Sequence, residues 1–369
     1  MVSEKLDKDF EASMRKALYS TKIEKTPSSQ TSLAEYNQKE VIEKVRQTYP
    51  QAWPAYNSAK TREKIIAEDL LLELLDYFEE PKHPMGRKPF SIKERILCMF
   101  IYSYGGFSSR RAMSDIEHAR RRNVISKTPH FNSVLNMFRD QAVTRMLFNI
   151  LEITALPLRP FEDKFSIDAT GFSSAYYERW LDIRTEKPSK KKKWMKLNLV
   201  VGNKTNVIVS VVVKEGFKSD CVDLPELVKN AARFFELKEV SADKGYLSNK
   251  NLEAIANIGA IPFIPFKVNT STKKRGRSLW KTMYEYFTDH QEDFMKHYHL
   301  RSNSETAFSM IKKNFRSNLR TKTFTSQVNE VLVKCICHNL SVLVQESFEL
   351  GLNIDFNKCY QEYLEVIGT

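Results

Sequence analysis

The sequence predicts an α/β protein in which a mixed β-sheet flanked by helices follows an all-helical N-terminal region. Before about residue 160 the chain is helical in pattern, with polar breaks between the segments. From residue 161 onward, short runs rich in β-branched and aromatic residues alternate with amphipathic segments. Such alternation is typical of a sheet with helices packed on it.

The 369 residues are enough for more than one domain. We expect an N-terminal helical region over 1–83, a second helical domain over 84–160, the sheet-containing domain over 161–345 and a C-terminal tail over 346–369. The run His83–Pro89 marks the first boundary, because it contains the helix-breaking residues Pro84, Gly86 and Pro89.

The second helical domain begins with a predicted helix pair. Ser91 and Glu94 have the spacing of a capping box, which predicts a helix from there to about residue 104. Gly105–Gly106 then turns the chain into a helix over about 109–121, which ends in three arginines. This pattern fits a DNA-reading helix-turn-helix and a plain helical hairpin equally well.

The sheet-containing domain has a regular order of expected elements. The strands are Phe165–Phe172, Trp180–Arg184, Trp194–Val201, Val207–Val213, Val240–Asp243 and Ile261–Phe266, with helices over Leu224–Phe235 and Asn249–Asn257 and a last helix that carries Glu305. The prolines in the last strand predict an edge position, because proline donates no ladder hydrogen bond. We interpret Asp223 as the cap of the first of these helices and leave Asp220 as an auxiliary acid.

Two of the predicted strands end in an aspartate beside apolar residues. Side chains alternate along a strand, so Ser166 and Asp168 share one face of the first strand, and Ser241 and Asp243 share one face of the later strand. Two carboxylates at the ends of core strands suit a hard divalent cation such as Mg²⁺.

The third acid, Glu305, belongs to a group of four polar residues. Tyr298, Arg301, Glu305 and Lys312 are spaced three, four and seven apart, which places them within an arc of about 60° if they lie on one α-helix. A carboxylate suits a metal ion, Arg and Lys suit phosphate oxygens, and the phenol can hydrogen-bond. The group therefore predicts a site for a metal-bound phosphodiester.

The charge of the chain points to a polyanionic partner. The net charge is +13, and basic residues gather in several runs. Beside the triple arginine, the runs that we expect to contact DNA are Lys190, Lys191, Lys192 and Lys193, and Lys273, Lys274, Arg275 and Arg277. A single lysine run is more often a solvated loop, so the expectation rests on their number and placement.

These residues together resemble a known family. The spacing Tyr-x2-Arg-x3-Glu-x6-Lys at Tyr298–Lys312 is similar to the signature of one group of DDE transposases of prokaryotic insertion sequences, and Ile167–Gly171 and Ala242–Tyr246 resemble the family's two Asp motifs in the same order. The resemblance covers about residues 84–345 and implies a ribonuclease H-like catalytic domain. The interval from Asp243 to Glu305 is short, so we expect little or no insertion domain there.

The resemblance implies an activity and a set of roles. Asp168, Asp243 and Glu305 would be the catalytic residues and would bind two Mg²⁺ ions, with Mn²⁺ as an expected substitute. Residues 84–160 would form a DNA-binding domain. The expected reaction is cleavage at the ends of the transposon followed by strand transfer into target DNA, with a homodimer holding two paired ends.

Tyr298, Arg301 and Lys312 would hold the DNA strand ends. In relatives with this signature a base is often flipped, and such a base needs an aromatic side chain to stack on. Trp280, flanked by basic residues, is our candidate; a buried structural tryptophan is the equally weighted alternative.

Cysteine use and hydropathy indicate where the protein works. The five cysteines are odd in number and dispersed, which predicts no disulfide framework. Cys335, Cys337 and His338 could suggest zinc, but their apolar surroundings favour core packing. The polar start shows no signal peptide and no apolar run is long enough for a membrane. We expect a cytoplasmic, nucleoid-associated protein of a prokaryotic cell.

Two other functions stay open. One is a domesticated transposase descendant that binds DNA without cutting it. The other is a hydrolytic nuclease on the same fold, which would cleave without joining. The presence of all three acids disfavours the first, and the residues suited to retaining strand ends disfavour the second.

Overall fold

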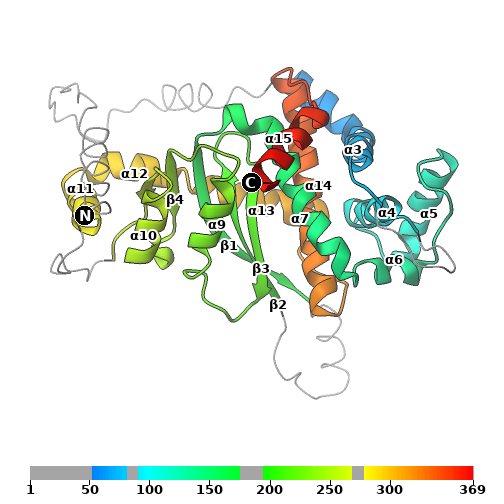
Figure 1. The fold of residues 1–369 in the computed structure, drawn as a ribbon, viewed down its shortest axis with the longest axis horizontal. Helices are drawn as coiled ribbons and strands as arrows, with labels where there is room; N and C mark the ends of the chain where they lie inside the picture. The colour runs from blue at the N-terminus through cyan, green and yellow to red at the C-terminus, as the bar shows by residue number, and fades with distance from the viewer. Residues whose placement is uncertain (1–51, 81–89, 175–193, 268–277, 369) are drawn as a thin grey trace, which may run out of the picture.

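The structure is a computed structural model that describes residues 52–80, 90–174, 194–267 and 278–368 (Figure 1). The helices before the sheet are α3 (Trp53–Asp76), α4 (Ile92–Gly105), α5 (Ser109–Arg121), α6 (Phe131–Met137), α7 (Gln141–Ala155) and η1 (Leu156–Phe161). The predicted capping box is present, since Ser91 Oγ accepts from the backbone N–H of Glu94 and the Glu94 carboxylate accepts from the N–H of Ser91.

The sheet has five strands within the described residues. They are β1 (Lys164–Ser173), β2 (Trp194–Gly202), β3 (Ile208–Glu215), β4 (Glu239–Ala242) and β5 (Ile261–Phe263), and they lie in the order β3-β2-β1-β4-β5. The first three strands pair antiparallel, whereas β4 pairs parallel with both β1 and β5. The expected strand at Trp180–Arg184 lies outside the described residues. The mixed sheet confirms the predicted fold class.

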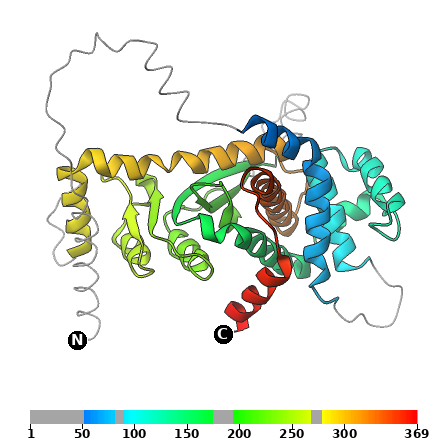
Figure 2. The ribbon, with the colours of Figure 1, turned by 90° about the horizontal axis from the view of Figure 1, so that it is seen from above.

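Helices cover both faces of the sheet (Figure 2). One face carries α9 (Leu224–Ala231) and α10 (Asn249–Ala256), and the other carries α12 (Gln291–His299), α13 (Ser302–Phe315) and α14 (Phe324–Glu349). Alternation along β1 explains the division, because Phe165 points to the first face, where its ring packs 5.7 Å from that of Phe235. Ser166 and Asp168 therefore face α13.

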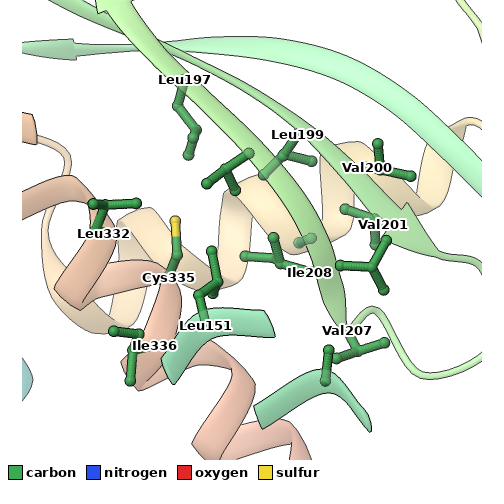
Figure 3. Packing of buried hydrophobic residues seen from close by; sticks show 14 of the residues in the cluster. Leu151, Leu197, Leu199, Val200, Val201, Val207, Ile208, Leu332, Cys335 and Ile336 are labelled. Atoms are coloured by element: carbon green, nitrogen blue, oxygen red, sulfur yellow. The ribbon is translucent and has the colours of Figure 1, made fainter. Parts of the chain in front are cut away.

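The long helix α14 forms the centre of the hydrophobic core. Its residues pack with α7, β2 and β3, as Leu332, Cys335 and Ile336 show in Figure 3. Cys335, Cys337 and His338 are fully buried, and His338 Nε2 lies 2.8 Å from the carbonyl oxygen of Asn206. Burial lowers the pKa of His338 to about 4, which keeps the ring neutral. The predicted core role of this cluster is confirmed.

The remaining elements complete the frame of the sheet. The strand β5 lies at the edge, as its prolines predict, with Pro262 opposite Val240. Between β4 and α13 the described residues form η2 (Lys244–Tyr246), α10, β5, α11 (Ser278–Asp289) and α12. The expected tail contains a helix, α15 (Phe356–Gly368). The domain boundaries stay predictions, since helices from before and after the sheet share one core.

Candidate active site

The parallel pairing of β1 with β4 brings two aspartates together. The last paired residues are Ile167 and Ala242, so Asp168 and Asp243 follow side by side at the point where β4 ends. The residues before them confirm that the two strands present the same face, since Ser166 Oγ lies 3.0 Å from Ser241 Oγ. Strand alternation then directs both carboxylates toward the face that α13 covers.

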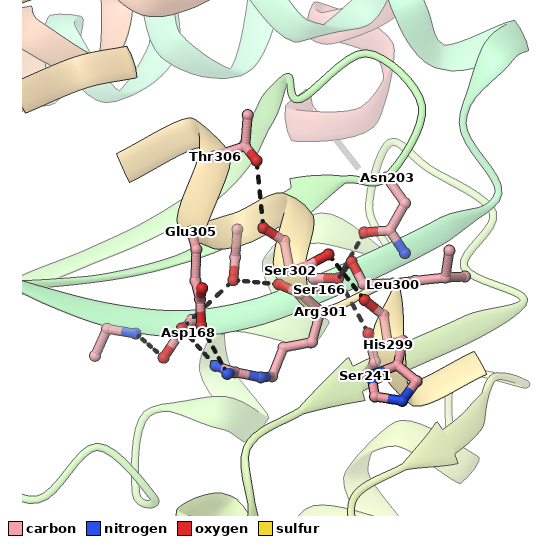
Figure 4. A network of polar contacts seen from close by, with 12 residues as sticks. Ser166, Asp168, Asn203, Ser241, His299, Leu300, Arg301, Ser302, Glu305 and Thr306 are labelled. Atoms are coloured by element: carbon pink, nitrogen blue, oxygen red, sulfur yellow. Dashed lines mark hydrogen bonds and ion pairs between the residues drawn. The ribbon is translucent and has the colours of Figure 1, made fainter. Parts of the chain in front are cut away.

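Arg301 connects the first strand to the helix that carries Glu305. Its Nη1 donates to Asp168 Oδ2 at 2.8 Å, and its Nη2 donates to Glu305 Oε1 at 2.8 Å (Figure 4). Asp168 also accepts from the backbone N–H of Ala169 at 2.8 Å and from Ser304 Oγ at 3.4 Å. The Glu305 side chain is largely exposed, whereas that of Asp168 is mostly buried.

The three acids influence one another electrostatically. Burial raises the pKa of the Asp168 carboxyl above its ordinary value. The Ala169 N–H and the Arg301 guanidinium oppose this shift, while the negative charges of Asp243 and Glu305 add to it. The site is therefore a concentration of negative charge that one guanidinium compensates only in part.

The four-residue signature does not lie on one continuous helix. Helix α12 ends at His299 and α13 begins at Ser302, so Tyr298 lies on α12 and Arg301 in the turn between them. The backbone hydrogen bonds in this turn join an N–H to the carbonyl oxygen three residues earlier, as from Arg301 N to Tyr298 O at 2.9 Å. The expectation of a single helix was wrong, although the backbone at Arg301 keeps right-handed helical angles.

A buried serine connects the turn to the sheet. Ser166 Oγ lies 3.1 Å from the carbonyl oxygen of Leu300, which immediately precedes Arg301 (Figure 4). Asn303 adds a second anchor, since its Nδ2 donates to the carbonyl oxygen of Asn203 at 2.7 Å. Ser166 and Ser241 are almost fully buried. The sheet thereby fixes where Arg301 and Glu305 lie relative to the aspartates.

The other two members of the signature flank the acids. Tyr298 is half-buried, and the Arg301 Cζ atom lies 5.9 Å from its ring centroid. Lys312, two turns beyond Glu305, donates to Thr170 Oγ1 on β1. Burial lowers the pKa of the Lys312 ammonium below its ordinary value. Both side chains thus border the same end of the sheet as the acids.

The donor chemistry of this site fits a divalent metal. Carboxylate oxygens from Asp168, Asp243 and Glu305 are the hard ligands that Mg²⁺ prefers. Among the described residues no three acidic, His or Cys side chains are already arranged to hold a metal ion. The positively charged guanidinium of Arg301 lies between Asp168 and Glu305 and neutralises part of their negative charge.

Trp280 lies away from this site and is buried. Only 4% of its surface is exposed, and its ring packs edge-on against Phe266 at 5.1 Å. The alternative of a structural tryptophan fits this placement, because a stacking platform requires an accessible ring face. The other expected DNA contacts, Lys190 to Lys193 and Lys273, Lys274, Arg275 and Arg277, lie outside the described residues.

The acids ahead of α9 pair with lysines of the sheet, and the auxiliary role of Asp220 stays a prediction. Asp223 occupies the N-cap position, but its side chain caps no backbone N–H and instead pairs with Lys214 and Asn198. Asp220 accepts from Lys196 Nζ at 3.0 Å. Asp223 is therefore the cap residue by position, as predicted, but its side chain does not cap the helix, because the lysine on β3 offers its carboxylate a stronger, charged partner.

Sequence reasoning missed several polar residues of the site. Ser304 and Thr170 contact the site residues Asp168 and Lys312, and Asn203 supports α13. Asn203 follows β2, and its role depends on the antiparallel pairing that brings the end of β2 beside the start of β1. For Ser304 the only available signal is its place directly before Glu305.

The sheet order and the acids facing α13 define a ribonuclease H-like domain. Residues 159–340, which contain all three acids, match the family model described as the transposase DDE domain. Residues 159–340 therefore form a transposase DDE domain, which confirms the resemblance for this part of the chain. No curated protein matches the chain. None of the described helices is both long and apolar enough to cross a bilayer.

Proposed function

We propose that this transposase uses Asp168, Asp243 and Glu305 to cut DNA at the ends of a transposable element and to join those ends to target DNA. The observation that supports this most is the parallel register that places Asp168 beside Asp243, with Arg301 tying Asp168 to Glu305. Cleavage would add water across a phosphodiester and free a 3′-OH, which would then displace a 3′ oxygen in the target strand.

The three carboxylates would hold the metal, and Mg²⁺ bound there would supply Lewis-acid stabilisation of the reacting phosphate. Arg301 would leave the carboxylates and donate to phosphate oxygens, for which its planar fork is suited. Lys312, now on Thr170, and Tyr298 would hold the strand end. The buried Ser166 and Ser241 would keep the Arg301 turn in place during these exchanges.

We further propose that the working unit is a homodimer on two paired DNA ends. A transposase must retain both ends until they are joined, which one site on one chain does not achieve alone. The net charge of +13 supports binding to terminal inverted repeats and to target DNA through their phosphates.

A strand-transfer assay tests the proposal. Protein, Mg²⁺ and DNA carrying the repeats that flank the gene should yield cut ends and joined product, and Asp168→Asn should yield neither while still binding DNA. Binding without cutting would support a domesticated descendant, and cutting without joining would support a hydrolytic nuclease. Retained cutting by Asp168→Asn would reject the assignment of the site.

A further inference from the structure

The arginines of α5 fall into two groups with different surroundings. At the C-terminal end, Arg120 Nη2 lies 2.7 Å from Glu117 Oε1, and Arg121 Nε lies 3.5 Å from the same oxygen. Arg122 Nη1 lies 2.9 Å from Glu68 Oε2. The hydrogen bond from Arg120 lowers the pKa of Glu117 to about 2. This triple arginine is therefore already paired with acids.

The arginines at the start of α5 have no such partners. Arg110 and Arg111 are exposed, and neither pairs with an acid within the described part of the chain. Their guanidinium groups lie over aromatic rings, Arg110 at 4.5 Å from the Phe131 centroid and Arg111 at 4.7 Å from that of Phe107. The rings orient the guanidinium planes and leave N–H donors for another anion.

These two cations do not stabilise their own helix. The first turn of α5 contains no acidic residue, and positive charge at a helix start opposes the helix dipole. Arg120 and Arg121, in the last turn, have the favourable placement. A role outside the helix therefore explains Arg110 and Arg111 better than a structural one.

A third arginine links this turn to the active site. Arg316, at the C-terminal end of α13, is exposed and has a positive φ of 71°, which a residue with a side chain rarely adopts. Its side chain lies against Gly106 in the α4–α5 turn, where an added Cβ would come within 3.0 Å of Arg316 Nε. Gly106 itself has a positive φ of 60°, and an added side chain there would also crowd Arg316.

Arg316 also continues the row of site residues along α13. Eleven residues separate it from Glu305, which corresponds to about 16 Å along the helix up to its C-cap. Lys312 lies between them, on the face of α13 that carries Glu305. Figure 2 shows α12 and α13 following one another toward the helices α3 to α5. A basic row thus leads from the acids to the α4–α5 turn.

We propose that Arg316, Arg110 and Arg111 bind the phosphates of a DNA duplex whose reacting phosphodiester lies at Asp168, Asp243 and Glu305. The proposal rests on the proposed function for the position of the reacting end. It assigns DNA contact to the start of α5 and to the end of α13, and it excludes the acid-paired triple arginine from that role.

The test compares two variants with the same change in charge on the same helix. Binding of a fluorescein-labelled 40-base-pair duplex is measured by anisotropy over a salt series for wild type, Arg110→Gln/Arg111→Gln and Arg120→Gln/Arg121→Gln. Each lost phosphate contact lowers the slope of log Kd against log salt by about one. We expect a decrease of about two for the first variant and little change for the second.

Arg316→Gln and Arg316→Gly should each lower the slope by about one, although glycine relieves the strained backbone. Thermal melts confirm that every variant is folded. Equal slopes for the two double variants, or wild-type slopes for the Arg316 variants, would overturn the proposal. The failure of this proposal can be told from the failure of the proposed function. If only this proposal fails, wild type still cuts and joins DNA, although the variants keep the wild-type salt slope. If only the proposed function fails, the variants lose slope but the protein cuts no DNA.

Discussion

Arg301 joins Asp168 to Glu305 through two hydrogen bonds of 2.8 Å, one from each terminal nitrogen of its guanidinium group. One acid lies on the central strand and the other on a helix more than a hundred residues later, so the contact closes the site between distant segments. The guanidinium occupies the space between two proposed metal ligands. Arg301 and a metal ion therefore compete for the same carboxylates.

Arg301→Gln should bind Mn²⁺ several-fold more tightly than wild type in the absence of DNA. Removing the guanidinium leaves Asp168 and Glu305 without a cation, and their repulsion favours a divalent ion. Titration calorimetry measures the affinity. Lys312→Gln is the matched control, because it removes one nearby positive charge that pairs with neither carboxylate. An equal gain in both variants would show a general charge effect and contradict the competition.

Ser166→Ala should lower both stability and catalysis. Loss of the hydroxyl leaves the Asn203 side chain and the buried Ser241 hydroxyl without this partner and removes the contact with the Leu300 carbonyl, which keeps the N–H of Asn303 as a donor. An unmade buried hydrogen bond costs about 1–3 kcal/mol in the free energy of unfolding. The Arg301 turn then loosens, so the cleavage rate at saturating DNA should fall as well. Ser210→Ala provides the control, since Ser210 is also buried but lies on the edge strand β3. Unchanged cleavage by a folded Ser166→Ala variant would show that Ser166 does not position the Arg301 turn.

Asp168→Asn should stabilise the metal-free protein relative to wild type, and more so as pH rises from about 3.9 through the folded-state pKa of Asp168. Burial raises the pKa of Asp168 in the folded state above its unfolded value, despite Arg301. The neutral form therefore contributes stability that is complete below about pH 3.9 and is lost as pH rises through the folded pKa. Asparagine does not ionise and keeps that contribution. Urea denaturation in EDTA over a pH series measures the difference, and a stability advantage of the variant that shrinks as pH rises would contradict the prediction.

Trp280→Ala should lower the free energy of unfolding by roughly 3–5 kcal/mol, because it empties a buried position beside Phe266. Trp280→Phe should lose much less. Chemical denaturation gives both values, and the DNA reaction is assayed under conditions in which each variant is folded. A Trp280→Ala protein as stable as wild type but unable to process DNA ends would instead support the stacking role.

The acids and the strands that carry them follow from local patterns. Alternation placed Ser166 with Asp168 and Ser241 with Asp243, and the hydrogen bond between the two serines confirms this arrangement. The prolines of β5 predicted its edge position for a local reason, the missing donor. These features depend on the periodicity of the backbone over a few residues. Such local periodicity can be predicted from a single sequence.

The connections between segments could not be predicted in the same way. The break between α12 and α13 lies at Leu300–Arg301, where no proline or glycine marks it. The turn at this break contacts Ser166, a residue 134 positions earlier in the chain. The pairing of Arg122 with Glu68 likewise depends on packing against α3, whereas Arg120 and Arg121 pair with Glu117 on their own helix at spacings that the sequence shows.

The central claim is that three carboxylates from distant segments share one metal site on DNA. Crystals of the protein bound to cut DNA ends and Mn²⁺, measured at the manganese absorption edge, test it most directly. The account predicts an anomalous peak in contact with Asp168, Asp243 and Glu305, with Arg301 moved from the carboxylates to a phosphate. A peak bound by other residues, or Arg301 still bridging Asp168 and Glu305 beside bound DNA, would contradict it.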